Sequence, residues 1–475
     1  MKGIRQWNLR GRIATMAILA SALFLTGCGK GTAESVQPSV EGTVESTEQT
    51  VSADIEEPET ADALEQTPGR FQYDYTKLYG EMQGMPVIGE EQAMAEGKTL
   101  LTLQTSLPNP WLTNSIAGFN RQSADYFIRL EETYGDDVKE RLSAELIAGR
   151  GPDIFDGSVF NVNESVLEKG VLVDLVPGLD AMGITDVEYF PGVRALRMGD
   201  GVYGIRSFIA PTGYSIRESV LGSREQPDIE TLVEKLYTYP DQKAVWWAGA
   251  RSERILEYLL SGSEDLWGMI DWEKGTCDFS GELFVKMLEI AKRYADPERK
   301  SQEEEERWII DYYNPVQNSS KQLESDGKVI INYPFDDGNY PAYERIGGVL
   351  MLNANSEHQE GAWEFLKYVL GEEGQGYSAG TSSLAVNKEM SRSCFEYHLK
   401  LLEEGRMQTT ADFTPEAIEK LFAFTEQGRD MPLRTKEILD IIYEEAQFFC
   451  DGDKPLEEVC DVIQRRVQIY ISETM

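Results

Sequence analysis

The amino-acid sequence predicts an α/β fold of two domains behind a long polar segment. Residues 142–156 start with apolar side chains at helical spacing, turn at glycine and proline, and end in a short apolar run typical of a buried strand. Residues 99–133 show the alternation of strand, helix and strand that is typical of a parallel sheet. About 400 residues follow the polar segment, which is enough for two domains with a large core.

The first 27 residues (1–27) have the features of a bacterial lipoprotein signal peptide. Basic residues precede an apolar run at 13–25, which is shorter than the roughly 18 residues of a membrane-spanning helix. The run ends in Leu-Thr-Gly followed by Cys28, which resembles the lipobox read by lipoprotein signal peptidase. The resemblance implies that Cys28 carries a lipid and anchors the mature protein to the extracellular face of the cell membrane. The alternative is a plain secretory signal in which the cysteine is incidental.

Residues 28–70 form a predicted disordered, acidic tether between this anchor and the folded part. From residue 29 onward they hold ten aspartates and glutamates against Lys30 and Arg70, and they contain no aromatic residue. Such a segment buries too little apolar surface to fold, and as a random coil it would reach on the order of 35–40 Å. Residues 71–97 lead into the folded part and give no assignment of their own.

The composition excludes some partners and some chemistry. The net charge of −37 argues against nucleic acid and anionic lipid as partners, and it is compatible with a neutral ligand. The cysteines show no CxxC pair or zinc-ligand spacing, and neither histidine lies near a GxSxG or HExxH pattern. We therefore expect no metal, no cofactor, and neither a histidine-dependent hydrolase nor a zinc protease.

Cys450 and Cys460 are expected to remain unbridged, although the protein is exported. Cys450 ends one predicted helix and Cys460 lies about five residues into the next, an offset of roughly 7 Å along the helix axis. Antiparallel helix axes lie roughly 8–10 Å apart, whereas a disulfide needs Cα atoms within about 7 Å of each other.

Residues 142–154 read Leu-x-x-Glu-Leu-Ile-Ala-Gly-x-Gly-Pro-Asp-Ile. This run resembles the signature turn of the extracellular solute-binding proteins of ABC importers, and of their carbohydrate-type group in particular. Further resemblances follow in the order of that family. They are Phe-Asn before the second strand, a crossing strand at 201–206, a strand at 328–335, Ala-Trp-Glu-Phe-Leu within 360–370, a return crossing at 382–388 and a closing helix at 463–473. Arg206 and Ala385 stand where the family usually has proline, which leaves both crossings less secure.

The resemblance implies a type II periplasmic-binding fold, with two α/β lobes and a ligand cleft between them. It places residues 98–206 and 345–383 in lobe 1, and residues 207–344 and 384–475 in lobe 2. The implied function is that of a monomeric, membrane-anchored receptor, not an enzyme, which binds a solute and delivers it to the permease of an ABC transporter. Ligand binding would favour the closed form of such a receptor.

An oligosaccharide is the expected ligand, because sugars present apolar ring faces and a rim of hydroxyls that aromatic and polar side chains match. A peptide or a polyol is an alternative, and core packing is the alternative role for any single ring. Rings are expected from both lobes, with Trp111 on the first and Tyr333 and Phe335 on the second. The candidate ligand-binding residues are Trp111, Asp156, Arg206, Trp246, Trp247, Tyr333, Phe335 and Asp336.

Two other functions remain open from the sequence. An exported glycoside hydrolase lipoprotein needs two carboxylates roughly 5–10 Å apart across a cleft, and the 82 aspartates and glutamates of the chain do not exclude such a pair. A ligand-sensing subunit that docks on a membrane kinase would share the fold of the receptor. No sequence motif points to either function.

Overall fold

The computed structural model describes residues 89–474. It leaves out residues 136, 161, 163, 242, 248, 299–307, 317, 319, 344–347, 379–382 and 408–413. All described residues belong to one compact unit, Gln72–Met475. The predicted signal peptide, Cys28, the tether and residues 71–88 of the lead-in lie outside the described residues. Within the described ranges, none of the helices has both the length and the apolar character of a membrane span.

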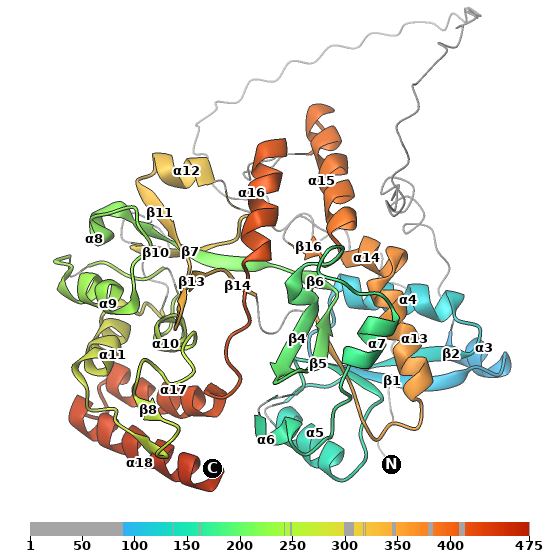
Figure 1. The fold of residues 1–475 in the computed structure, drawn as a ribbon, viewed down its shortest axis with the longest axis horizontal. Coiled ribbons are helices and arrows are strands. Elements are labelled where there is room, and N and C mark those ends of the chain that lie inside the picture. The colour runs from blue at the N-terminus through green and yellow to red at the C-terminus, as the bar shows by residue number, and fades with distance from the viewer. Residues whose placement is uncertain are drawn as a thin grey trace, which may run out of the picture. The chain divides into compact units, whose positions relative to one another are not determined.

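A six-stranded mixed sheet organises the first lobe, in the order β2-β1-β3-β15-β5-β4 (Figure 1). Its strands are β1 (Thr99–Thr105), β2 (Tyr126–Glu132), β3 (Ile154–Asp156), β4 (Arg194–Met198), β5 (Gly201–Arg206) and β15 (Val349–Leu352). β1 runs parallel to β2 and β3, as the sequence pattern predicts, while β15 and the β4–β5 hairpin are antiparallel. Ile154 and Phe155 belong to different core clusters because successive side chains of a strand point to opposite faces of the sheet.

The run at residues 142–154, which resembles the family's signature turn, makes contacts that join three strands of this sheet. Helix α5 (Val138–Ile147) ends before Gly149 and Gly151, both of which have positive φ (70° and 108°). Asp153 then accepts hydrogen bonds from the backbone N–H of Thr102 at 2.7 Å and from the hydroxyl of Ser356 at 2.6 Å. This carboxylate therefore ties β3 to β1 and to the loop after β15, and the turn is a structural element of the lobe.

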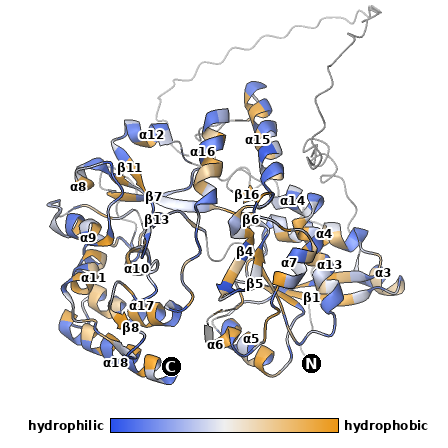
Figure 2. Cartoon of the chain, in the orientation of Figure 1, coloured by the Kyte–Doolittle hydropathy of each residue, from blue (hydrophilic) through white to orange (hydrophobic). Residues whose placement is uncertain are grey.

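The second lobe is built on the antiparallel strand β7 (Pro211–Arg217), which pairs with β10 (Ile310–Tyr313), β11 (Lys328–Ile331) and β14 (Ala342–Tyr343). The helices whose apolar sides form its core are α9 (Ile229–Thr238), α10 (Ser252–Leu260), α11 (Glu282–Tyr294), α17 (Lys436–Asp451) and α18 (Leu456–Thr474). Figure 2 shows hydrophobic and hydrophilic residues alternating along α17 and α18, the pattern of helices with one buried face. Cys450 at the end of α17 and Cys460 in α18 are both free in this structure.

The other described elements are shorter or connect the lobes. They are α3 (Glu90–Ala95), α4 (Pro110–Gln122), α6 (Glu164–Leu167), α7 (Val176–Ala181), η2 (Pro191–Val193), β6 (Phe208–Ile209), α8 (Glu218–Leu221), β8 (Ile270–Asp271), β9 (Thr276–Cys277), α12 (Ser320–Ser325), β12 (Tyr333–Phe335), β13 (Gly338–Tyr340), α13 (Gln359–Leu370), α14 (Glu372–Ser378), β16 (Leu384–Ala385), α15 (Lys388–Glu403) and α16 (Pro415–Glu426).

The packing of residues 384–426 differs from the lobe boundary expected from the sequence. These residues were expected in lobe 2, but Leu384, Phe395 and Phe422 belong to the core of the first sheet. β16 pairs with β6, and the ring of Phe422 meets that of Phe190 edge-on at 5.2 Å. Of the described residues after α16, those that pack in the second core are Met431 and the apolar side chains of α17 and α18. The chain therefore enters the second lobe for the last time after α16.

Candidate functional site

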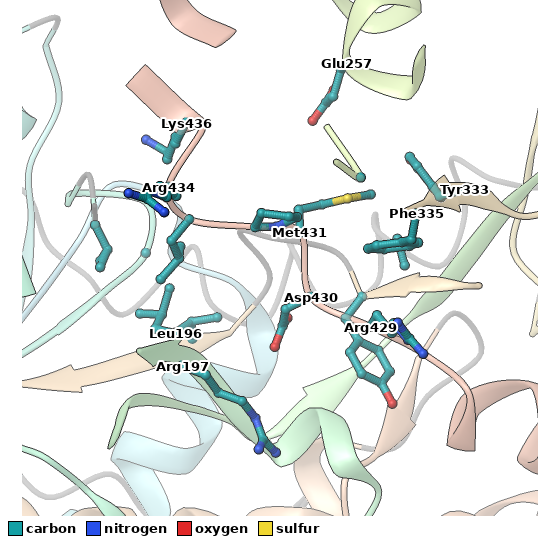
Figure 3. A pocket seen from close by; sticks show the side chains of 18 of the residues that line it. Leu196, Arg197, Glu257, Tyr333, Phe335, Arg429, Asp430, Met431, Arg434 and Lys436 are labelled. Atoms are coloured by element: carbon teal, nitrogen blue, oxygen red, sulfur yellow. The ribbon is translucent and has the colours of Figure 1, made fainter. Parts of the chain in front are cut away.

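A cavity of about 1410 Å³ lies between the two lobes and is lined by both of them. The first lobe contributes the end of the β4–β5 hairpin, Gly157 after β3, and Met351 of β15. The second lobe contributes β7, α10, β12 and the start of α17. Residues 428–434, which connect α16 with α17, complete the lining (Figure 3).

The second-lobe wall is a cluster of aromatic rings around Tyr214. The ring of Tyr214 lies 4.3 Å from that of Tyr258 and 5.2 Å from that of Tyr333, and it stacks on Trp247 at 5.9 Å with the planes inclined by 24°. Tyr214 and Tyr333 are buried, whereas Trp247 is half-buried and lines the cavity. The rings therefore support one another from the core outward and present a fixed apolar surface.

The hydroxyl groups of this wall are neutral hydrogen-bonding groups. The oxygens of Tyr214 and Tyr333 lie 3.2 Å apart. Burial raises the pKa of Tyr214 well above its ordinary value and raises that of Tyr333 to about 12, because the ionised form would lose its hydration. At neutral pH both groups can donate and accept hydrogen bonds without carrying charge.

Charged groups surround the aromatic wall, and two of the carboxylates beside it are paired with arginines. Glu257 accepts from Arg254 at 2.6 Å on α10, and Asp337 accepts from Arg429 at 2.6 Å. Figure 3 shows Glu257 pointing into the cavity above Tyr333 and Phe335. Such a ring of donors and acceptors around apolar faces suits a ligand with many hydroxyl groups.

Arg206 and Tyr343 lie where the chain crosses between the lobes. Arg206 is 3% exposed; its Nη2 donates to Asp430 Oδ1 at 2.5 Å and its Nη1 donates to the carbonyl of Gly192 at 3.1 Å. Its Nε has no partner among the described residues. The Tyr343 ring lies 5.6 Å from this guanidinium. A Cβ on Gly192 or Gly428 would come within 2.9 or 2.4 Å of that ring, so both positions require glycine.

Five of the eight residues predicted as ligand contacts line the cavity. They are Arg206, Trp247, Tyr333, Phe335 and Asp336. Of these, Asp336 also accepts a hydrogen bond from the backbone N–H of Glu264 at 3.0 Å, so one carboxylate oxygen is already engaged.

The other three predicted residues are placed elsewhere. Trp246 is fully buried in the second core, and Trp111 is 8% exposed and packs edge-on against Phe208 at 5.4 Å in the first core. Asp156 is buried below the cavity lining, where it accepts from the hydroxyl of Thr105 at 2.5 Å and from the backbone N–H of Ser158 at 2.8 Å. Burial raises the pKa of Asp156, and these hydrogen bonds oppose that shift.

Sequence reasoning missed Tyr214, the charged residues of α10, the β4–β5 hairpin end and the connecting segment 428–434. Glu253 and Glu257 lie four residues apart, which places them on one face of a helix. This spacing could have identified them as neighbouring side chains from the sequence. The connecting segment shows only a glycine and a proline, which indicate a loop but not its place in the fold. Among the described residues, no group of three His, Cys, Asp or Glu side chains could hold a metal ion.

Comparisons with known proteins identify the fold. No protein-family model and no curated protein sequence matches this chain. Among solved structures, the sugar-binding protein MalE from Xanthomonas citri matches with a TM-score of 0.51 and 15% identity, over 79% of this chain and 98% of that one. Maltose-bound MalE3 from T. maritima matches with a TM-score of 0.50 and 16% identity, over 78% and 99% of the two chains. A chitin oligosaccharide binding protein also matches with a TM-score of 0.50, at 13% identity over 79% and 99%.

All three of these proteins carry the names of binding proteins rather than of enzymes. At these identities the likeness concerns the fold. The resemblance found in the sequence is confirmed at that level: this chain has the periplasmic-binding fold of the carbohydrate-type solute-binding proteins.

Proposed function

We propose that this protein is an extracellular receptor that binds an oligosaccharide in the cavity between its lobes and delivers it to the permease of an ABC transporter. The observation that carries the proposal is the wall of rings around Tyr214, with Trp247 exposed to the cavity and Glu257 and Arg254 beside it. Sugar rings stack on such faces while their hydroxyls bond to charged and polar neighbours. The structural neighbours named for maltose and for chitin oligosaccharide support the same ligand class.

The proposed receptor works by closing its lobes on the ligand, without catalysis. We assign residues 98–206 and 349–426 to lobe 1, and residues 211–343 and 436–474 to lobe 2. Segments between these ranges cross at Arg206 and Tyr343, and the backbone N–H of Tyr343 donates to the carbonyl of Arg429 at 2.9 Å. A hinge that includes the described segments 207–210 and 427–435 would let the lobes rotate as rigid bodies. A ligand that touches both lobes stabilises the closed form by its differential affinity.

The proposed location follows from the first 70 residues of the sequence. Cys28 would carry the lipid, and the acidic segment after it would let the receptor reach a permease in the same membrane. Release of a Cys28→Ala variant into the medium, measured by fractionation, supports the anchor; retention of that variant in the membrane contradicts it.

Thermal-shift screening against a panel of oligosaccharides, followed by product analysis on every hit, tests the proposed function. The expected result is a rise in Tm with at least one sugar and no change in the sugar after prolonged incubation, because ligand binding to the folded form stabilises it by mass action. Cleavage of the sugar would identify a glycoside hydrolase. Capture of a histidine kinase, and no permease, from solubilised membranes would identify a sensing subunit.

A further inference from the structure

The cavity is much richer in cations than the chain that forms it. The whole chain has 45 lysines and arginines against 82 aspartates and glutamates. The described lining of the cavity has seven of each. The cations are Lys139, Arg197, Arg206, Arg254, Arg429, Arg434 and Lys436. The cavity lining therefore does not share the net negative charge of the whole chain, because it holds equal numbers of cationic and anionic side chains.

Two of these cations have no anionic partner within the described part of the chain. Arg206, Arg254 and Arg429 pair with Asp430, Glu257 and Asp337. Arg434 lies 4.0 Å from the ring of Trp272. Lys139 and Arg197, both on the first lobe, are exposed side chains, and neither forms an ion pair with any described residue. The first-lobe wall thus offers positive charge that the described protein groups do not neutralise.

The backbone around Arg197 is bent in a way that presents this side chain to the cavity. Leu196 has a φ of 56°, a left-handed conformation that is unfavourable for a residue with a Cβ. Leu196, Arg197 and Met198 all line the cavity, although successive side chains of a regular strand would face opposite sides. In Figure 3, Arg197, Arg434 and Lys436 lie toward one side of the cavity, and Tyr333 and Phe335 lie toward the other.

The exposed charge at Arg197 distinguishes neutral from anionic ligands. A neutral ligand that closes the cavity would remove water from the guanidinium without replacing its interactions, which is costly for a charged group. A carboxylate or sulfate would replace that water with charge-assisted hydrogen bonds, which are roughly twice as strong as neutral ones. The acidity of the rest of the chain opposes an anion only weakly at the site, because salt at 0.1 M screens charges beyond about 10 Å.

We propose that the ligand is an anionic oligosaccharide, with a carboxylate or sulfate group bound at one of the first-lobe cations, Arg197 or Lys139, and with uncharged ring faces on the wall around Tyr214. This inference rests on the proposed function and names the ligand class. It replaces the neutral ligand that the net charge of the chain suggested. Arg197 is then a specificity-determining residue of the first lobe.

Titration calorimetry with matched trisaccharides tests this inference on the full mature chain. The set is a neutral galactose trisaccharide, its uronate counterpart and its sulfated counterpart. The anionic sugars are expected to bind about tenfold or more tighter than the neutral one, with an affinity that falls as salt is raised. Arg197→Gln should reduce this preference to within about twofold, because the charge-assisted hydrogen bonds to the anion are lost and the neutral sugar no longer dehydrates a charged group. Arg150→Gln, an exposed arginine of the same lobe outside the cavity lining, should leave the preference intact.

Each outcome of the experiment is decisive. Binding of the neutral sugar as tightly as both anionic sugars overturns the inference and leaves the proposed function standing. A preference that persists in a folded Arg197→Gln variant and in a folded Lys139→Gln variant overturns the assigned site. Failure of all three trisaccharides to bind, when the panel screen has found another neutral oligosaccharide that does bind, overturns this inference and leaves the proposed function standing; failure of the whole panel overturns both. A preference for uronate over sulfate, or the reverse, identifies which anion the site accepts.

Discussion

The two walls of the cavity are built on different physical principles. The second-lobe wall is made of rings that are buried against one another, so that Trp247 rests on Tyr214 and Tyr214 rests on Tyr258. The first-lobe wall consists mainly of aliphatic side chains, backbone at the end of a hairpin and the long cationic side chains Lys139 and Arg197, with one buried ring, that of Phe160. A ligand would meet a preorganised surface on one side and side chains that must still be ordered on the other.

This difference has an energetic consequence for binding. Rings fixed by core packing have already lost their side-chain entropy during folding, whereas arginine and lysine side chains lose up to about 2 kcal/mol each when they are immobilised. For the proposed receptor we therefore expect the second lobe to supply most of the affinity in the open form, and the first lobe to add its contacts when the lobes close. The predictions below test this asymmetry.

Trp111→Ala is expected to have the largest effect, on stability rather than on binding. Trp111 is buried in the first core against Phe208, so its truncation should lower the free energy of unfolding by about 3–5 kcal/mol. Urea denaturation measures this loss, and calorimetry on the remaining folded protein should give a ligand affinity within twofold of the parent. If Trp111→Ala instead bound the ligand more weakly and kept the free energy of unfolding of the parent, Trp111 would be a ligand contact on the first-lobe wall. The two walls would then no longer differ in their use of aromatic rings.

Trp247→Ala is expected to weaken ligand binding by about 2 kcal/mol, or some thirtyfold, with a smaller effect on stability. Its ring is half-buried and stacks on Tyr214 at the cavity. Calorimetry with the best sugar from the screen measures the loss. The matched control is Tyr237→Ala, which removes an exposed ring of α9 that does not line the cavity. Equal affinities of the two variants would show that the rings around Tyr214 do not hold the ligand.

Asp156→Asn is expected to have the smallest effect, visible in the pH dependence of stability. The folded protein raises the pKa of Asp156 above its ordinary value of 3.8, mainly through burial. The unfolded chain therefore releases this proton first, and the stability contributed by the group falls as pH rises through the interval above 3.8. The free energy of unfolding of the parent minus that of the variant, measured between pH 3.5 and 7, should fall as pH rises, because the other carboxylates of the chain cancel in this difference. A difference between the two proteins that does not change with pH would contradict the raised pKa.

Elements that depend on a pattern of adjacent residues could be predicted from the sequence. The alternation of strand, helix and strand predicted over residues 99–133 is observed as β1, α4 and β2, because the apolar runs of these elements are bounded by polar turns. The signature turn was also located correctly, but its carboxylate at Asp153 holds strands together and does not contact the cavity. A motif can therefore indicate a fold without containing a site.

The site itself depended on contacts that no local pattern records. Trp246 and Trp247 are neighbours in the sequence, and only the packing of α10 and α11 decides which of them is core and which faces the cavity. Arg197 could not be identified because the positive φ of Leu196 has no sequence signal in a non-glycine residue. Residues 428–434 reach the cavity only because α16 packs in the first core and α17 in the second.

The adjacent pair Trp246 and Trp247 also gives the protein an internal optical probe. Both indoles lie within 6 Å of a tyrosine ring, Trp246 beside Tyr258 and Trp247 on Tyr214. Light absorbed by these tyrosines can therefore pass to the two tryptophans and leave as tryptophan emission. Trp246 is shielded from solvent, so its emission should hold steady, whereas Trp247 exchanges water for ligand when the cavity fills. Occupancy of the cavity would then be reported by the colour of the protein's own fluorescence, without an attached dye.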